Sequence, residues 1–278
     1  MNYKFRLKPL GVFLISCLVI IIIIIGLYLF YYNNYSYIVT GKLDHLPRHK
    51  YNYDYLIDDN GHLIYRDLDN DIIGIKGIDV SHYQKDIDWV KVKNDGIEFA
   101  FISVGYRGYE SGKLNLDPKF YDNITGALAA GLDVGVYIFS QAINTKEAID
   151  EANFVLKHIK GFDISFPLVY DLEDIHKEKH RIMYMSKEER TNVALAFCGR
   201  ILQEGYIPMV YTNLYWANDY YDLSLILNYD IWFAQYSDIP EFVYDYDIWQ
   251  YSEDGRVDGI STPVDLNIYF IEKGIRYE

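Results

Sequence analysis

The chain has 278 residues, of which half are hydrophobic and 17% aromatic, so it can bury the core of one enzyme-sized domain with segments left over. Its 26 basic and 40 acidic residues give a formal net charge of −14, which argues against nucleic acid or anionic lipid as the main partner, because both are bound through basic patches. Of two cysteines, Cys17 falls in an apolar run and Cys198 in a helical pattern. This excludes an intradomain disulfide, and no Cys/His cluster has the spacing of a zinc site.

The first element is an apolar segment near the N-terminus. Residues 10–30 read LGVFLISCLVIIIIIIGLYLF, a run that crosses the roughly 30 Å hydrocarbon core at about 1.5 Å per residue. The alternative is a cleavable signal peptide, but its apolar core would be about 7–15 residues long and would end at a small-residue cleavage site. Basic residues precede the run, so the positive-inside rule places residues 1–9 in the cytoplasm. We predict a transmembrane signal-anchor at 10–32, with the remainder of the chain extracellular.

Residues 33–71 are predicted to form a stem. They begin with a polar stretch that lacks sustained periodicity. The sequence YDYLIDDNGHLIYRD then places two short apolar runs around Asn60-Gly61, a dipeptide that favours a type I′ turn. We therefore expect a β-hairpin within the stem. Residues 1–32 hold three basic and no acidic residues, so the external part keeps 23 basic and 40 acidic residues, a formal charge of −17.

Residues 72–278 alternate between short β-rich runs and helical patterns. Strands are expected at 75–80, 98–106, 133–140, 166–173, 207–213, 230–236, 246–252 and 264–270, and helices at 87–95, 118–131, 145–160 and 186–205. Such alternation implies parallel pairing through right-handed crossovers, and about eight strands suggest a closed α/β barrel. The later connections are too short for full helices, which predicts an irregular (β/α) barrel. A doubly wound open sheet is the alternative, but the Gly-rich phosphate loop that often accompanies it is absent.

Carboxylates occur where several of these strands end, and barrel enzymes place their chemistry at the C-terminal ends of strands. Asp79 ends the first strand, Asp171 and Glu173 end the fourth, and Asp265 lies near the start of the eighth, two residues before Asn267. Side chains alternate along a strand, so Asp171 and Glu173 share one face. Each acid alone could be a solvated loop start. Clustered carboxylates raise one another's pKa, and they can either bind a metal through oxygen ligands or divide acid and base roles in glycoside hydrolysis.

Aromatic residues near the strands favour the carbohydrate interpretation, because aromatic faces beside carboxylates suit sugar rings. Any one of them is as easily a core residue. The candidates on or just beyond strands are Tyr106, Tyr137, Phe139, Tyr211, Trp216, Trp232, Trp249 and Tyr251. Tyr137, Tyr211 and Gln250 are the stronger candidates for sugar contacts, since they carry polar tips at strand ends.

Taken in order, eight segments resemble the successive motifs of glycoside hydrolase family 25, the N-acetylmuramidases of the Chalaropsis-lysozyme type. They are GIDVSHYQKDIDW (77–89), VGYRGYESGKLNLDPKF (104–120), GVYIFSQAINTKEAIDEANFVL (135–156), FPLVYDLED (166–174), YTNLYW (211–216), DIWFAQY (230–236), DIWQYSEDGRVDGI (247–260) and VDLNIYF (264–270). The resemblance implies an irregular β/α barrel that cleaves the β-1,4 bond between N-acetylmuramic acid and N-acetylglucosamine in peptidoglycan glycan strands. It implies no metal, no other cofactor and no required protein partner.

The family pattern also suggests roles for individual residues. Glu173 would be the general acid and base, Asp171 its partner at the reacting sugar, and Asp79 and Asp265 the supporting acids of the cleft. The substrate-binding candidates are Tyr137, Tyr211, Gln250, Arg107, Phe139 and Asn267. One departure is visible, because the family motif usually has Gly after Gln84 whereas this chain has Lys85-Asp86, which puts substrate preference at that loop in doubt.

Two other functions stay open on the sequence. The chain could be a membrane-tethered wall-binding protein that has lost turnover, or an anchored hydrolase of another polysaccharide. The presence of all four acids favours an active enzyme. The attacking group on the sugar is either a carboxylate or the substrate's own 2-acetamido group.

Overall fold

The computed structural model describes residues 16–30, 43, 45–174 and 180–272. The chain divides into two compact units, Met1–His45 and Leu46–Glu278. In the first unit a helix covers residues 16–30. Within the described residues, no helix has both the length and the apolar character required to cross a bilayer. Residues 10–15 and 31–32 of the predicted anchor, and the tail 1–9, lie outside the described residues, so the anchor stays a prediction.

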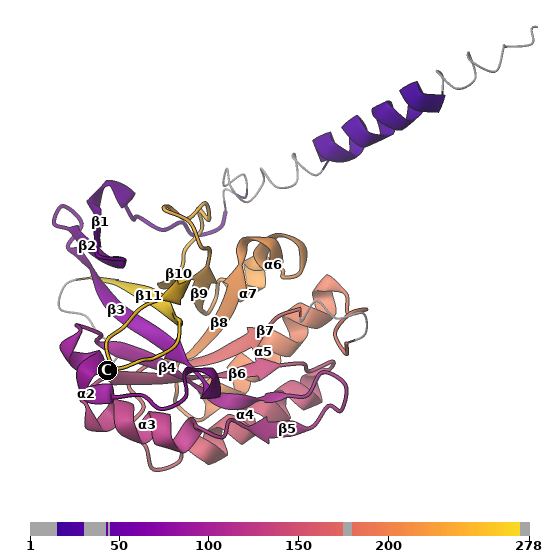
Figure 1. Ribbon diagram of the computed structural model, residues 1–278. Helices are drawn as coiled ribbons and strands as arrows, with labels where there is room; N and C mark the ends of the chain where they lie inside the picture. The colour runs from indigo at the N-terminus through magenta and orange to yellow at the C-terminus, as the bar shows by residue number, and fades with distance from the viewer. Residues whose placement is uncertain (1–15, 31–42, 44, 175–179, 273–278) are drawn as a thin grey trace, which may run out of the picture. The chain divides into compact units, whose positions relative to one another are not determined.

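Eight strands of the second unit close into a barrel (Figure 1). They are β3 (Ile72–Val80), β4 (Phe99–Arg107), β6 (Asp133–Ser140), β7 (Leu168–Leu172), β8 (Pro208–Asn213), β9 (Asp230–Ala234), β10 (Ile248–Gly255) and β11 (Val264–Glu272). Neighbours pair in parallel in the order β3-β4-β6-β7-β8-β9-β10, and β11 closes the ring between β10 and β3. The predicted closed barrel is confirmed, and each predicted strand overlaps one of these eight.

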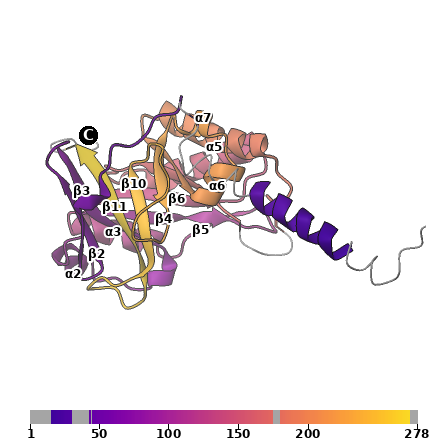
Figure 2. The same ribbon diagram turned by 90° about the horizontal axis from the view of Figure 1, so that it is seen from above.

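Strand β11 departs from the parallel pairing that the alternating pattern predicted. It runs antiparallel to both neighbours, with Asp265 opposite Asp79 and Asn267 opposite Gly77. The connection from β10 to β11, residues 256–263, contains turns and bends but no helix, and a chain that turns back without a crossover pairs antiparallel. The start of β11 therefore lies at the same end of the barrel as the C-terminal ends of the parallel strands. Figure 2 shows β2, β3, β11 and β10 side by side.

The predicted helices are present as α2 (Trp89–Asn94), α3 (Phe120–Ala129), α4 (Thr145–Ile159) and α5 (Lys187–Gln203). Figure 1 shows α3, α4 and α5 on the outer side of β4, β6, β7 and β8. Local caps set where the helices begin: Asn144 accepts a hydrogen bond from the Glu147 N–H at the start of α4, and Ser186 and Glu189 form a capping box for α5. The elements η1 (Tyr53–Tyr55), η2 (His82–Gln84), β5 (Leu114–Leu116), α6 (Leu214–Asp219) and α7 (Leu223–Ile226) were not predicted, and short runs of this kind give weak periodicity.

Aromatic rings fill the barrel interior. Phe101 stacks on Trp232 with ring centroids 4.7 Å apart, and Phe99 stacks on Phe166 at 4.9 Å. Gly77 leaves room for this packing, since a Cβ at that position would lie 2.2 Å from the Phe99 ring. The barrel interior is thus a packed core and not a channel.

The predicted hairpin is present in the segment before the barrel. Strands β1 (Leu56–Asp59) and β2 (His62–Asp67) pair antiparallel, and Asn60 and Gly61 between them both have positive φ, at 56° and 87°. Strand β2 also pairs with the start of β3, and the Tyr51 hydroxyl donates to the Tyr246 carbonyl at 2.6 Å. The part of the predicted stem from residue 46 to residue 71 therefore packs in the same compact unit as the barrel.

Candidate active site

A cleft of about 530 Å³ opens at the barrel mouth, and all four predicted carboxylates line it. Four of the six predicted substrate-binding residues line it too, namely Tyr137, Phe139, Tyr211 and Gln250. Its other lining residues are Ser81, His82, Tyr83, Gln84, Ser103, Gly105, Tyr106, Asp117, Trp232 and Tyr236. The acids come from segments that are far apart in the sequence: β3 supplies Asp79, β7 supplies Asp171, Glu173 directly follows β7, and β11 supplies Asp265.

Strand geometry explains why these acids converge. Alternate residues of a strand face the same side, so Asp171 shares an inward face with the core residue Val169, two positions earlier. The same holds on β4, where Phe101 lies in the core and Ser103, two positions later, lines the cleft. The acids thus occupy the first inward layer above the aromatic core.

Asp79 lies at the centre of a buried hydrogen-bond network. Its Oδ2 accepts from Gln250 Nε2 and from Asn267 Nδ2, each at 2.8 Å. Asn267 is fully buried, and its Oδ1 accepts from Trp232 Nε1 at 2.8 Å. Gln250 Oε1 in turn accepts from the hydroxyls of Tyr211 and Tyr236, each at 3.0 Å. Asn267 therefore supports Asp79 from below the cleft and does not line the cleft itself.

The four acids differ in acid strength. Burial raises the pKa of Asp79 to about 6, while hydrogen bonds from Asn267, Gln250 and Asp265 act in the opposite direction. Burial and the charge of Asp79 raise the pKa of Glu173 to about 7 and that of Asp265 to about 9. Burial, then the charges of Glu173 and Asp79, raise the pKa of Asp171 well above its usual range. At neutral pH the cluster therefore holds protonated and ionised carboxyls side by side.

Asp171 has an unsatisfied acceptor. Its Oδ1 is buried and has no hydrogen-bond partner among the described residues. Leaving a buried acceptor unpaired costs about 1–3 kcal/mol. A ligand that donates a hydrogen bond at this position would remove that cost.

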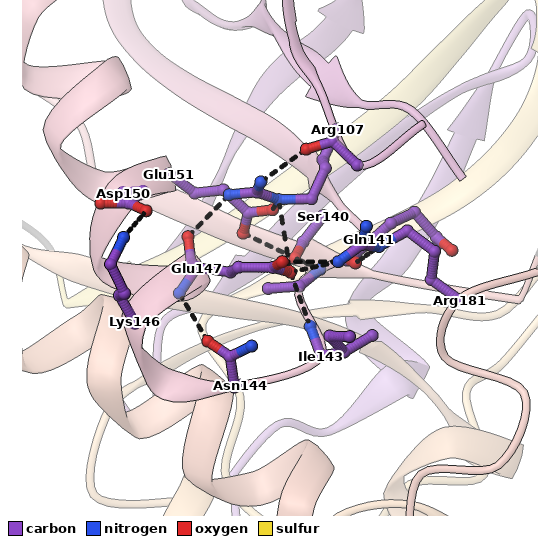
Figure 3. Close-up of polar contacts among 12 residues, drawn as sticks. Arg107, Ser140, Gln141, Ile143, Asn144, Lys146, Glu147, Asp150, Glu151 and Arg181 are labelled. Carbon is purple, nitrogen blue, oxygen red and sulfur yellow. Dashed lines mark hydrogen bonds and ion pairs between the residues drawn. The ribbon is translucent and has the colours of Figure 1, made fainter. Parts of the chain in front are cut away.

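Arg107 is placed outside the cleft, contrary to the predicted substrate contact. Its side chain is buried, and Nε donates to Glu151 Oε1 at 2.6 Å while the other two nitrogens donate to the carbonyls of Gly112 and Glu147 (Figure 3). The pairing of β4 with β6 shifts register between Ser103 and Gly105. Tyr106 then faces the cleft, and its neighbour Arg107 faces α4 on the outer side. A position near a strand end does not reveal such a shift, so the sequence could not exclude Arg107.

The ion-pair network around Arg107 reaches the chain that carries Glu173. Gln141, at the end of β6, is fully buried, and its Nε2 donates to the backbone carbonyl of Glu173 at 3.0 Å. The Gln141 carbonyl accepts from Arg181 Nε at 3.2 Å, and Arg181 Nη2 lies 2.6 Å from both carboxylate oxygens of Glu147 (Figure 3). The adjacent Ser140 hydroxyl contacts Glu151 at 2.7 Å. The sequence gives no hint of Gln141, because one glutamine after a strand forms no motif.

The remaining aromatic candidates divide between the cleft and other parts of the barrel unit. Tyr106 and Trp232 line the cleft. Trp249 is buried and donates to the Gln235 carbonyl at 2.9 Å, and Trp216 is buried under the Arg190 guanidinium. Tyr251 lines a separate hollow beside the hairpin.

The metal alternative was also open on the sequence. In the described part of the chain, no group of three or more His, Cys, Asp or Glu side chains is arranged to hold a metal ion.

A closed barrel with buried carboxylates and aromatic rings at one mouth is an arrangement typical of glycoside hydrolases. The sequence model of Glycosyl hydrolases family 25 matches residues 78–260. The chain belongs to this family and is a glycoside hydrolase of the lysozyme class.

Individual relatives agree with this assignment. Lysozyme M1 of Streptomyces globisporus is 28% identical over 208 residues, covering 71% of this chain and 68% of the relative. The uncharacterized protein YegX of Escherichia coli strain K12 is 32% identical over 206 residues, which cover 70% of this chain and 69% of YegX. The solved structure of the modular autolysin LytC from Streptococcus pneumoniae superposes with a TM-score of 0.65 at 22% identity over 77% of this chain, which shows a shared fold. The matched part spans about half of LytC, 52% of its length.

The support that Gln141 gives to Glu173 generates a first prediction. We expect Gln141→Ala to lower kcat on purified cell walls by about tenfold with little change in KM, because small displacements of a catalytic group cost rate more than binding. Initial rates of turbidity loss at several wall concentrations measure both constants. Lys146→Ala on the exposed side of α4 is the matched control. Equal kcat values for Gln141→Ala and the control would contradict the positioning role.

The raised pKa of Glu173 generates a second prediction, for stability. A carboxyl whose pKa is higher in the folded state stabilises the fold most at low pH, and this contribution is lost as pH rises to about 7. Glu173→Gln cannot ionise, so its melting temperature relative to wild type should increase by roughly 5–10 °C between pH 5 and pH 8, which corresponds to about 2.5 kcal/mol. Thermal unfolding followed by circular dichroism measures this. The exposed control Glu204→Gln should show no such change, and a constant difference for Glu173→Gln would contradict the burial argument.

Proposed function

We propose that this protein cleaves the β-1,4 bond between N-acetylmuramic acid and N-acetylglucosamine in peptidoglycan glycan strands. The observation that carries the proposal is the graded set of carboxyls at one cleft, in a chain of family 25. A glycosidase needs one group that is protonated at working pH next to others that stabilise positive charge. Glu173, Asp171 and Asp79 have the environments that this division of roles requires.

Glu173 acts as the general acid in this mechanism. With a pKa of about 7, about half of its population is protonated at neutral pH, and the protonated form is acidic enough to donate to the glycosidic oxygen. The bond from that oxygen to the anomeric carbon then breaks, and the leaving sugar departs as a neutral alcohol. The oxocarbenium-like charge that develops on the remaining sugar is stabilised by the ionised fraction of the neighbouring carboxyls.

Asp171 orients the second reacting group. Its buried, unpaired Oδ1 is an acceptor suited to the N–H of a 2-acetamido group, whose carbonyl oxygen can then attack the anomeric carbon. This substrate-assisted route is available to N-acetyl sugars. Water opens the resulting ring with Glu173 acting as the base, so the product retains the configuration of the substrate. Direct attack by Asp171 is the other route.

The cleft walls provide the sugar contacts. Tyr83 and Tyr106 are 73% and 43% exposed, and both line the cleft, so their rings are accessible for stacking. Tyr137, Tyr211 and Gln250 lie deeper, where Tyr211 and Gln250 are already joined by a hydrogen bond. Polar groups deep in the cleft and exposed aromatic rings at its edge are suited to binding a chain of sugars.

The membrane anchor is a separate proposal. We infer that residues 10–32 hold the hydrolase at the outer side of a cell membrane, with residues 1–9 in the cytoplasm. The uncharged run at 10–30 and the helix at 16–30 support it. A tether would raise the effective concentration of an acidic domain near the wall, which is rich in anionic polymers.

Product analysis tests the hydrolase proposal. Purified peptidoglycan digested with the protein should yield fragments with new muramic acid reducing ends by mass spectrometry after reduction. Glu173→Gln should lower the rate about 10³-fold, since general acid catalysis contributes 10²–10⁴, while Glu204→Gln should match wild type. New glucosamine reducing ends would contradict the bond assignment. Equal clearing by wild type and Glu173→Gln would favour a wall-binding protein, and no release from peptidoglycan would favour another polysaccharide.

Cell fractionation tests the anchor. The full chain should sediment with membranes and resist extraction by salt and alkali, and external protease should remove the barrel from spheroplasts. A chain lacking residues 1–32 should appear in the soluble fraction. Recovery of the full chain in the soluble fraction, or protection from external protease, would contradict the proposed anchoring or its orientation.

A further inference from the structure

We infer that His82, held by Asp117, binds a carboxylate of the substituent that distinguishes muramic acid from glucosamine. This inference rests on the proposed function, because it concerns the same cleft and its glycan substrate. The carboxylate has two sources, the lactyl group of bare strands or the stem peptide of intact strands. Both present the same chemistry, an anion attached to the muramoyl O-3 position.

His82 is bonded to a buried acid at the edge of the cleft. Its Nδ1 lies 2.8 Å from Asp117 Oδ2, and the same oxygen accepts the His82 backbone N–H at 3.1 Å. The Asp117 side chain is 3% exposed, and its Oδ1 accepts the Lys119 N–H at 2.8 Å. A histidine whose Nδ1–H is held by a carboxylate has its ring orientation and tautomer fixed. Nε2 is then the ring nitrogen left for a ligand, and it has no hydrogen-bond partner among the described residues.

The loop that carries His82 is held in place by contacts within the protein. His82 starts the short helix η2, which has a capping box formed by Ser81 and Gln84. Gln84 Nε2 also donates to the Pro263 carbonyl at 3.3 Å, which ties η2 to the segment before β11. The Tyr83 ring packs on the His82 ring with centroids 4.2 Å apart. Preorganisation of this kind lowers the entropy that a binding group loses when a ligand arrives.

The cleft is lined by acidic side chains, and His82 is the group there that can offset the charge of an anion. Among the described residues that line the cleft, every charged one is an acid apart from His82, which alone can become a cation. The nearby ammonium group of Lys119 is already paired with Asp86 and Asp122, at 2.7 and 3.0 Å. An anionic substituent that enters this cleft is repelled by the acids unless one group compensates its charge. When both ring nitrogens of an imidazole carry a proton, the nitrogen that faces away from the bonded carboxylate can donate a charge-assisted hydrogen bond, and in His82 that nitrogen is Nε2.

The test uses three substrates made from one preparation of glycan strands. The first keeps its stem peptides, the second is stripped by an amidase and exposes the lactyl carboxylate, and the third is stripped and then converted to the neutral lactyl amide. We compare kcat/KM of the full chain with that of His82→Gln. His158→Gln is the matched control, because His158 lies on α4 and bonds to Tyr121 outside the cleft.

His82→Gln should lower kcat/KM about tenfold on substrates that carry the bound carboxylate, as expected for one charged hydrogen bond, and should leave the neutral strands unchanged. A loss on intact strands alone identifies the stem peptide as the source, and a loss on stripped strands identifies the lactyl group. His82→Arg, which keeps a cation, should restore most of the rate, and Asp117→Asn should reproduce part of the loss. An equal loss on all three substrates, or no loss on any, would overturn the inference. If wild type cuts none of the strands, the proposed function itself fails, which is a different result.

Discussion

Four carboxyl groups lie at the mouth of one barrel, with Asp79 and Asp171 buried and Glu173 and Asp265 half-buried, and lost hydration and like charge both oppose their ionisation. The hydrogen bonds of the rest of the site determine how far each carboxyl is affected by this constraint. Two side-chain amides, Gln250 and Asn267, donate to Asp79, whereas Asp171 keeps an oxygen with no partner among the described residues. This unequal supply of donors separates the acid strengths of groups that are chemically alike. A cluster with graded pKa values can hold and release a proton at neutral pH, which a set of equivalent acids could not do.

The reversed strand β11 makes this arrangement possible. In an all-parallel barrel the first residues of a strand lie at the bottom, far from the catalytic mouth. Because β11 runs antiparallel, its first residues lie at the mouth, with Asp265 opposite Asp79. Asn267, one inward layer deeper, then reaches Asp79 from below and is itself held by Trp232. The Trp232 ring thus packs in the barrel core and also orients the Asn267 amide beneath the cleft.

A second polar layer lies outside the barrel and holds the ends of the strands. The Arg107–Glu151 ion pair is buried, and burying such a pair is favourable only when good geometry and additional hydrogen bonds offset the lost hydration. Here the guanidinium donates to two carbonyls as well, and the adjoining Gln141 reaches the backbone of Glu173. The polar residues at strand ends therefore serve two purposes. Some face the cleft, and others hold the backbone from which the cleft-facing groups project.

Local patterns in the sequence determined the eight barrel strands, the four predicted helices of the barrel unit and the Asn60-Gly61 turn, because each depends on neighbours a few residues apart. Period-two alternation also determined that Asp171 and Glu173 share one face of their strand. Tertiary structure decided what depends on distant residues: the reversal of β11, the register shift that turned Arg107 outward, and the contacts of Gln141, His82 and Asn267. These are pairings between residues whose separation in the sequence carries no signal of their distance in space. The sequence therefore identified the acids, and only the closed barrel determined which of them share hydrogen bonds and so how strongly each holds its proton.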